Sequence, residues 1–304
     1  MGGDQVRGAG VAIPRRLAAL RAGPLALATP AVAVLLVFFV APLAAFAVYS
    51  FLTGTFYEVH SPLTLDNYRD VVDSHLHRTL ARNSLLVGLF AAVATVVFAL
   101  PIAYWLRYTR SRWRMVVMFL IIASFLASYL VRIYAWRTIL GSNGLINSGL
   151  EELGLIDDPL TLLLYNRFAV TVALVHIYLP YVVLVVYAGL GPLSPAYLET
   201  AQDLGAGRWQ RWRRVVLPVA AAPVASAFLF VFVLSAADYV TPQFLGGTTG
   251  SLLGVIVQQN MTAQGDYALG AAIAFSMLAA FLVLYGVVAL ALRLKRLDRV
   301  RFVT

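Results

Sequence analysis

The sequence has no cysteine among its 304 residues, which excludes disulfides, thiolate metal sites and cysteine nucleophiles. It is also poor in charge, because Asp, Glu, Lys and Arg make up 12% of the chain, against about 25% in soluble domains. Lysine occurs once, at Lys295, and no glycine-rich stretch precedes it. A phosphate-binding loop of the type G-x-x-x-x-G-K-[ST] is therefore absent, and any ATP hydrolysis has to occur on another chain.

Apolar residues are abundant instead, at 61% of the chain. A helix needs roughly 20 mainly apolar residues to cross a bilayer. Six runs meet that length, at about 25–50, 79–106, 114–140, 169–191, 217–240 and 267–292. The first run is longer than the apolar core of a signal peptide, about 7–15 residues, so we expect a retained span. The prediction is an all-α, polytopic membrane protein with six transmembrane helices.

The charges alternate along the chain. Four segments (1–24, 107–114, 192–216 and 293–304) hold four, four, four and five of the 23 basic residues. The loops between them carry most of the acids. Because cytoplasmic loops are enriched in Lys and Arg, we expect both termini and the basic loops in the cytoplasm. The net charge of +9 then lies at membrane edges and needs no nucleic acid. This organisation gives a basic N-terminal segment (1–24), a transmembrane domain (25–292) and a basic tail (293–304).

The loop between the fourth and fifth runs, residues 193–218, predicts two short helices. Ser194 suits the cap of a helix start, and Pro195 suits its first position, where a missing N–H has no partner to lose. Gly205 fits the left-handed residue that closes a helix. Apolar residues recur at helical spacing before it, at Tyr197, Leu198, Ala201 and Leu204. A second helix, 207–215, carries arginine and tryptophan into the fifth span.

This loop resembles a signature of permease subunits of binding-protein-dependent ABC importers: Glu-Ala-Ala, three residues, Gly, nine residues, an aliphatic residue, one residue, Leu-Pro. Here the pattern reads Glu199-Thr200-Ala201, Gly205, Val215 and Leu217-Pro218, with Thr200 as the one departure. In that family the loop is the coupling helix that sits in a groove of the cytoplasmic ATPase. The resemblance assigns coupling to Glu199, Thr200, Ala201, Gln202, Asp203, Leu204, Gly205 and Arg208.

The resemblance also implies the rest of the assembly. The fold is an importer-permease (MetI-like) bundle in a bacterial cytoplasmic, or inner, membrane. Its partners are a second homologous permease, two cytoplasmic ATPase subunits, an extracytoplasmic solute-binding protein and the lipid bilayer. The chain itself is not an enzyme and holds no cofactor, since ATP and Mg belong to the ATPase. Two other classes stay open: a secondary transporter, which would show internal repeats and interrupted spans, and a membrane scaffold that transports nothing.

A narrower resemblance points to the spermidine/putrescine permeases. It is carried by four segments: 131–136, 141–147, 153–156 and 238–247. The implied solute is a polyamine or a related small cation. That subfamily more often has Gly-Glu-Phe where this chain has Ala237-Asp238-Tyr239, and permeases for iron, thiamine or other small ligands share much of the framework, so these solutes remain alternatives.

Asp238 is the only acid inside a predicted span, where an aspartate at mid-membrane costs roughly 2.5–3.5 kcal/mol. Arg132 lies about eight residues inside the third run, or roughly 12 Å deep along a straight helix. We hypothesise that both face the bundle interior. Tyr239, Tyr134 and Trp136 would then offer aromatic faces to an ammonium group. The alternatives are an interfacial acid in water and aromatics that anchor the chain at the membrane surface.

Other features leave their roles open. His176, in the fourth run, could face the pathway or bond to a neighbouring helix. Residues 251–260 are apolar but too short to span, which favours an outer-surface or re-entrant helix. His60, His75 and His77 lie on or beside the first outer loop without metal-ligand spacing, so no metal site is predicted. No catalytic triad or paired-carboxylate site is visible.

Overall fold

The computed structural model describes residues 24–55, 58–60 and 62–294. The basic residues predicted at the N-terminus, and those that follow Arg293, lie outside the described residues. The chain divides into two compact units, residues 1–48 and 49–304.

The first unit is the first predicted span. It consists of α1 (Pro24–Leu35), a π-helical turn η2 (Leu36–Val40) and α2 (Ala41–Tyr49), which follow one another without a break. Thr29–Tyr49 has 21 residues, or about 32 Å of helix, enough to cross a hydrocarbon core. Within this unit none of the side chains of η2 and α2 is buried, although these are almost all apolar. Such a surface requires lipid or a further protein surface to cover it.

The second unit opens with a hairpin of β1 (Thr53–Thr55) and β2 (Glu58–His60), paired antiparallel with Thr53 opposite His60. Next come α3 (Asp66–Asp73) and α4 (His75–Tyr108). Ser74 caps α4 by accepting a hydrogen bond from the His77 N–H. The hairpin was not predicted, because strands of three residues are too short to show a period of two.

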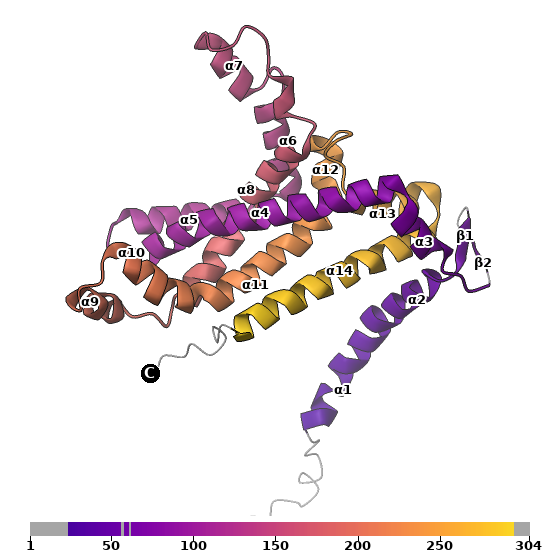
Figure 1. The fold of residues 1–304 in the computed structure, drawn as a ribbon, viewed down its shortest axis with the longest axis horizontal. Coiled ribbons are helices and arrows are strands. Elements are labelled where there is room, and N and C mark those ends of the chain that lie inside the picture. Colours follow the sequence, from indigo (N-terminus) through magenta and orange to yellow (C-terminus); the bar gives the residue numbers. More distant parts are fainter. Residues whose placement is uncertain (1–23, 56–57, 61, 295–304) are drawn as a thin grey trace, which may run out of the picture. The chain divides into compact units, whose positions relative to one another are not determined.

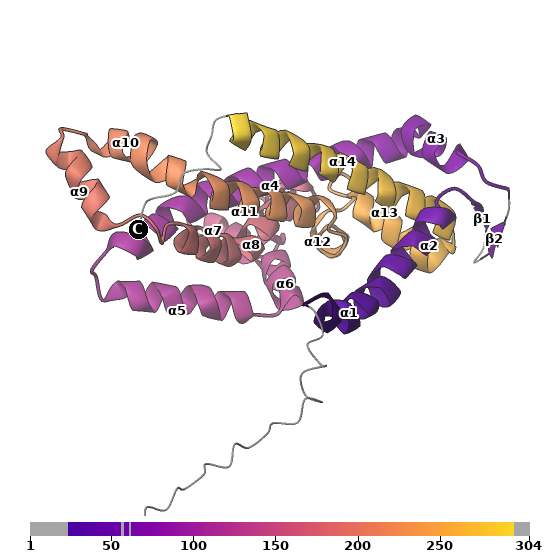
Figure 2. The same ribbon diagram turned by 90° about the horizontal axis from the view of Figure 1, so that it is seen from below.

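The core of this unit is formed by α4, α8 (Arg167–Gly189) and α11 (Leu217–Ala236), which run alongside one another (Figures 1 and 2). One face of α4 is made of small buried residues: Gly88, Ala91, Ala92, Thr95, Ala99 and Ala103. Small residues let membrane helices approach closely. At Gly88 the fit is tight enough that an added Cβ would lie 2.8 Å from the Cβ of Ala236.

The third predicted span, 114–140, is wrong as a single helix. It is broken into α5 (Trp113–Leu126) and α6 (Tyr129–Leu140), and the chain bends there by 101°. Ala127 and Ser128 both have extended backbone angles, with ψ of 143° and 137°, so the helical hydrogen-bond ladder stops between them. Figure 1 shows α6 and the following α7 (Leu145–Glu152) turning away from the direction of α4 and α5. A 3-10 turn, η3 (Thr161–Leu163), leads on to α8.

The second helix of the 193–218 loop is not separate from the fifth span, contrary to the prediction. After α9 (Pro195–Asp203), the chain forms α10 (Arg208–Arg211), a π-helical turn η4 (Trp212–Val216) and α11 as one run. In the π turn the Leu217 N–H bonds to the Trp212 carbonyl, five residues back. This local widening lets the helix continue through Pro218, which has no N–H to donate.

Two short helices follow α11 before the last long one. They are α12 (Val240–Leu245) and α13 (Leu253–Gln259), the latter extended by a π turn η5 (Asn260–Gln264). The segment 251–260 is thus largely helical, and Leu253, Gly254 and Val255 are buried. The last helix, α14 (Tyr267–Leu294), packs against α11 and α13.

Among the described residues, five helices are long and apolar enough to cross a membrane, and the bent third pair brings the total to six. The prediction of an all-α, polytopic membrane bundle is confirmed. Helices α9 and α10 lie at one end of the bundle in both views, and α3 and α13 lie toward the other (Figures 1 and 2).

Candidate functional site

The segment from Ser194 to Leu217, called here the coupling segment, begins with a well-capped helix. Ser194 Oγ accepts from the Ala196 N–H at 3.3 Å, and Pro195 occupies the first turn of α9. At the other end Gly205 has φ of +82°, the left-handed conformation that glycine adopts without strain. The Gly205 N–H bonds to the Gln202 carbonyl and the Ala206 N–H to the Ala201 carbonyl, each at 2.9 Å. This is the paired bonding of a Schellman motif, so the predicted start and stop of α9 are confirmed.

The coupling segment is fastened to the end of α4. Arg107 donates to the Gly191 carbonyl and Tyr108 to the Leu193 carbonyl, both at 2.9 Å, just before α9 begins. Leu198 is the buried residue of α9 and joins the main core. On the far side, the Trp212 ring lies 4.9 Å from that of Tyr104. Both ends of the segment are therefore held by the long helix α4, which leaves little freedom for it to move alone.

Most residues assigned to coupling project into solvent. Leu204 is 83% exposed, and Trp209, on the neighbouring α10, is 72% exposed. An exposed leucine and tryptophan on a rigid projection are typical of a protein-binding surface. Gln202 has a second role, because its Oε1 accepts from Arg211 at 2.9 Å and ties α9 to α10. The exposed coupling residues are Glu199, Thr200, Gln202, Asp203, Leu204, Gly205 and Arg208, while Ala201 is half-buried.

A second cluster of polar groups surrounds Asp238, directly after α11. This side chain is 9% exposed, and its carboxylate accepts three hydrogen bonds. Oδ1 accepts from the Val240 N–H at 3.1 Å, and Oδ2 accepts from the Thr241 N–H at 3.2 Å and from the Tyr129 hydroxyl at 2.9 Å. Asp238 therefore caps α12 and also links it to the first residue of α6. Three donors already occupy the two carboxylate oxygens.

Arg132 lies on α6, one turn beyond Tyr129. Its Nη1 donates to the Ile177 carbonyl at 2.9 Å, and its buried Nε has no partner in the described structure. The depth predicted for Arg132 assumed a straight third span, and the 101° bend removes that basis.

The hypothesis for Arg132 and Asp238 is that both face the bundle interior. Asp238 is buried and Arg132 is half-buried, and no ion pair joins them in the part of the chain that the structure describes. Tyr178 of α8 lies within electrostatic range of both side chains.

The three aromatic residues predicted with Asp238 differ in exposure. Tyr239 and Tyr134 are 45% and 49% exposed, so their faces are available to a ligand. The Tyr134 ring also contacts Phe244 at 5.1 Å. Trp136 is half-buried, and its ring meets the His176 ring edge-on, with 5.7 Å between the two ring centres. The His176 side chain therefore lies against α6.

Three hydroxyl-bearing residues of this cluster were missed by sequence reasoning: Tyr129, Tyr178 and Thr241. Tyr129 also bonds to Thr241 Oγ1, at 2.8 Å. The small pair Ala127-Ser128 before Tyr129 gives no signal, because the same pair, Ala123-Ser124, lies inside the continuous helix α5. Nothing in the sequence places Tyr178, on a different helix, beside Tyr129.

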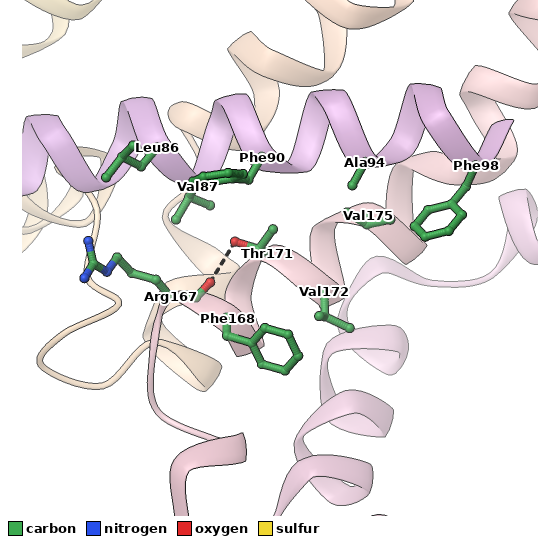
Figure 3. A pocket seen from close by; sticks show the side chains of 10 residues that line it. All are labelled: Leu86, Val87, Phe90, Ala94, Phe98, Arg167, Phe168, Thr171, Val172 and Val175. Atoms are coloured by element: carbon green, nitrogen blue, oxygen red, sulfur yellow. Dashed lines mark hydrogen bonds between the residues drawn. The ribbon is translucent and has the colours of Figure 1, made fainter. Parts of the chain in front are cut away.

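A separate groove lies between α4 and α8. It encloses about 770 Å³ and is lined chiefly by aliphatic and aromatic side chains, including Phe90, Phe98 and Phe168. Figure 3 shows these side chains between the two helices, with Arg167 at one end. The Arg167 guanidinium already donates to Asn83 Oδ1 at 3.3 Å. This is a surface for lipid or helix contact rather than a polar solute site.

A helical bundle with several spans, no phosphate loop and a rigid projecting segment defines a membrane transport component. Comparison with known proteins gives the family. The model described as "Binding-protein-dependent transport system inner membrane component" matches residues 80–296. The chain belongs to this family. It is a permease subunit of an ABC importer, a multi-pass inner membrane protein that does not hydrolyse ATP itself, as the sequence predicted. It works with ATPase subunits and a solute-binding protein.

Similar curated proteins include two spermidine/putrescine transport system permease proteins PotB. That of Escherichia coli (strain K12) is 31% identical over 209 residues, 69% of this chain and 75% of that protein. That of Haemophilus influenzae is 28% identical over 216 residues, 71% and 75% of the two chains. The Escherichia coli inner membrane ABC transporter permease protein YdcU is 30% identical over 223 residues, 69% and 70% of the chains.

Among solved structures, a bacterial ABC transporter for alginate import has a TM-score of 0.72 at 18% identity, over 91% of this chain and 96% of that one. The MetNI methionine transporter has a TM-score of 0.53 at 15% identity, over 75% and 100%. These likenesses show the fold.

Proposed function

We propose that this permease imports a polyamine, spermidine or putrescine, or a closely related small cation. The observation that carries the proposal is the similarity, near 30% identity over more than two thirds of the chain, to permeases named for these solutes. Permeases of the same type for iron, thiamine or another small ligand remain the second candidate.

The proposed orientation places both termini and the coupling segment in the cytoplasm, because the basic segments lie there by the positive-inside rule. Two ATPase subunits then receive the coupling segments of this chain and of a second, homologous permease. The exposed surface of α9 and α10 supports this docking, and the bonds from Arg107 and Tyr108 supply the stiffness that transmission needs.

The proposed pathway passes the cluster around Asp238. The buried carboxylate supplies a negative field, and the exposed rings of Tyr239 and Tyr134 supply cation–π contacts to an ammonium group. Since Asp238 is already bonded to three donors, it acts on a passing cation through its charge rather than by becoming a direct ligand.

The test measures uptake of labelled spermidine and putrescine by the complete importer, with unlabelled competitors. Asp238→Asn removes the charge, while an asparagine still caps α12. We expect a loss of at least tenfold in uptake at normal expression. Tyr129→Phe is the matched control, because it removes a hydrogen bond to the same carboxylate and leaves the charge. Unchanged uptake in Asp238→Asn would remove this residue from the pathway, and an equal loss in both variants would indicate a structural role only.

A further inference from the structure

A basic groove lies where the loop between α4 and α5 meets α8, and the transport mechanism above does not use it. It encloses about 730 Å³. Arginines line one end and apolar side chains of α5 line the remainder: Arg110, Arg112 and Arg114, then Met115, Met118 and Phe119. The groove therefore has a cationic end and an apolar wall.

Two arginines at or beside the cationic end are held in place by Tyr187 of α8. Arg114 donates to the Tyr187 hydroxyl at 2.7 Å, and its guanidinium lies 5.9 Å from the centre of that ring. Arg107 lies against the same ring, at 5.8 Å. Tyr187 thus orients two cations, while Arg110 and Arg112 stand exposed beside them.

None of these arginines forms an ion pair with an acidic side chain of the described residues. The sequence has no Asp or Glu between residues 74 and 150, nor in α8. Among the described residues, the ion pairs found all lie within residues 58–77, far along the chain. The positive charge of the four arginines between residues 107 and 114 is therefore available to an anion from outside the chain.

The apolar wall shows what kind of partner fits. Met115 is 80% exposed and Phe119 is 69% exposed, and both lie on α5, the apolar first half of the bent candidate span, which continues away from the arginines. A free phosphate or carboxylate would use the arginines and leave this wall bare. A molecule with an anionic head and a long apolar tail uses both, and basic pockets at the ends of membrane helices recognise such head groups.

We propose that this groove binds an anionic phospholipid, with its phosphate at Arg110 and Arg112 and an acyl chain along α5. The choice of the cytoplasmic leaflet rests on the orientation proposed above, whereas the class of lipid does not. Because Arg107, in the same cluster, holds the Gly191 carbonyl ahead of α9, a bound head group would lie beside the fastening of the coupling segment.

The test is native mass spectrometry of the complete importer after incubation with dioleoyl phosphatidylglycerol or dioleoyl phosphatidylcholine. We expect retention of phosphatidylglycerol in preference to phosphatidylcholine. The double variant Arg110→Gln and Arg112→Gln should lower that retention roughly 30-fold, at about a fivefold loss for each arginine near the surface. The charge-matched control Arg78→Gln and Arg82→Gln, at the other end of α4, should leave it unchanged.

Three results would overturn the proposal: equal retention of the two lipids, an equal loss in both double variants, or unchanged retention in the Arg110 and Arg112 variant. Loss of partner subunits from that variant, with lipid retention intact, would instead assign the groove to an acidic partner segment. Lipid retention does not depend on the solute, so a failed polyamine assay leaves this result standing.

Discussion

Replacing Gly205 should disconnect ATP hydrolysis from transport by changing the backbone rather than by steric overlap. With φ of +82° the residue is in the left-handed region, but no atom lies within 4 Å of the position that a Cβ would take. The cost of a side chain is therefore conformational, roughly 1–2 kcal/mol for an ordinary L-residue and more for a β-branched one. Such a cost lowers the population of the native turn by about 5–30-fold.

The expected loss of coupled uptake among Gly205 variants does not follow side-chain size. Gly205→Val should be the most damaging variant and Gly205→Ser intermediate. Gly205→Asn should stay close to the parent, because asparagine tolerates the left-handed conformation despite its larger volume. Gly207→Ser is the matched control: Gly207 has φ of −64° and caps α10, so serine suits it.

The assay is the complete importer in proteoliposomes, with ATP hydrolysis and uptake of labelled spermidine measured on the same preparation. We expect the Gly205→Val complex to assemble and hydrolyse ATP with strongly reduced uptake for each ATP consumed. Full uptake in this variant would refute the coupling role. If Gly205→Asn fails as badly as valine, the requirement is for an open contact surface, and the backbone argument is wrong.

Two further predictions concern packing. The buried Asn83 donates to the carbonyls of Thr249 and Ser251, each at 3.2 Å. Asn83→Ala removes both bonds, and we expect a cost of about 1–3 kcal/mol for the two together, seen as a lower midpoint of thermal unfolding in detergent. An unchanged midpoint would show that water replaces the amide. A Cβ at Gly189 would overlap the ring of Pro223, so Gly189→Ala should cost about 1–3 kcal/mol of stability and reduce the yield of assembled importer. The control Gly286→Ala, with open space around it, should leave the yield unchanged. Equal yields for the two variants would show that α8 and α11 separate easily.

Much of the fold could be predicted because membrane spans are read from length and apolarity alone. The helix start at Ser194-Pro195 and its end at Gly205 were equally predictable, since caps depend on local chemistry within a few residues. The break at Ala127-Ser128 could not be predicted. Neither residue is a strong helix breaker, and the run around them is apolar enough to span without interruption.

The candidate pathway shows a different limit. The buried position of Asp238 was predictable from the cost of an acid in an apolar run. Its partner Tyr129 was not, because Tyr129 reaches it from another helix, and one sequence carries no signal of contact across 109 residues. The comparable depth of Asp238 and Arg132 was inferred for straight helices, and the bend between α5 and α6 removes that premise.

The coupling segment and the Asp238 cluster are joined by one helix. From Arg208 to Ala236 the chain is helical for 29 residues, about 43 Å, and Asp238 follows two residues later. Under the coupling role proposed above, a displacement of α10 would reach Asp238 unless it were absorbed at the π turn or at Pro223, and the Trp212–Tyr104 contact braces the first of these. At the far end, the Tyr129 bond would pass the displacement to α6, directly after the break in the third span. Because the break separates α6 from α5, the cluster would shift with α11 while α5 stayed in place. Transmission of motion from one end of the bundle to the other would thus need both features: an unbroken helix from Arg208 to Ala236 and the break between α5 and α6.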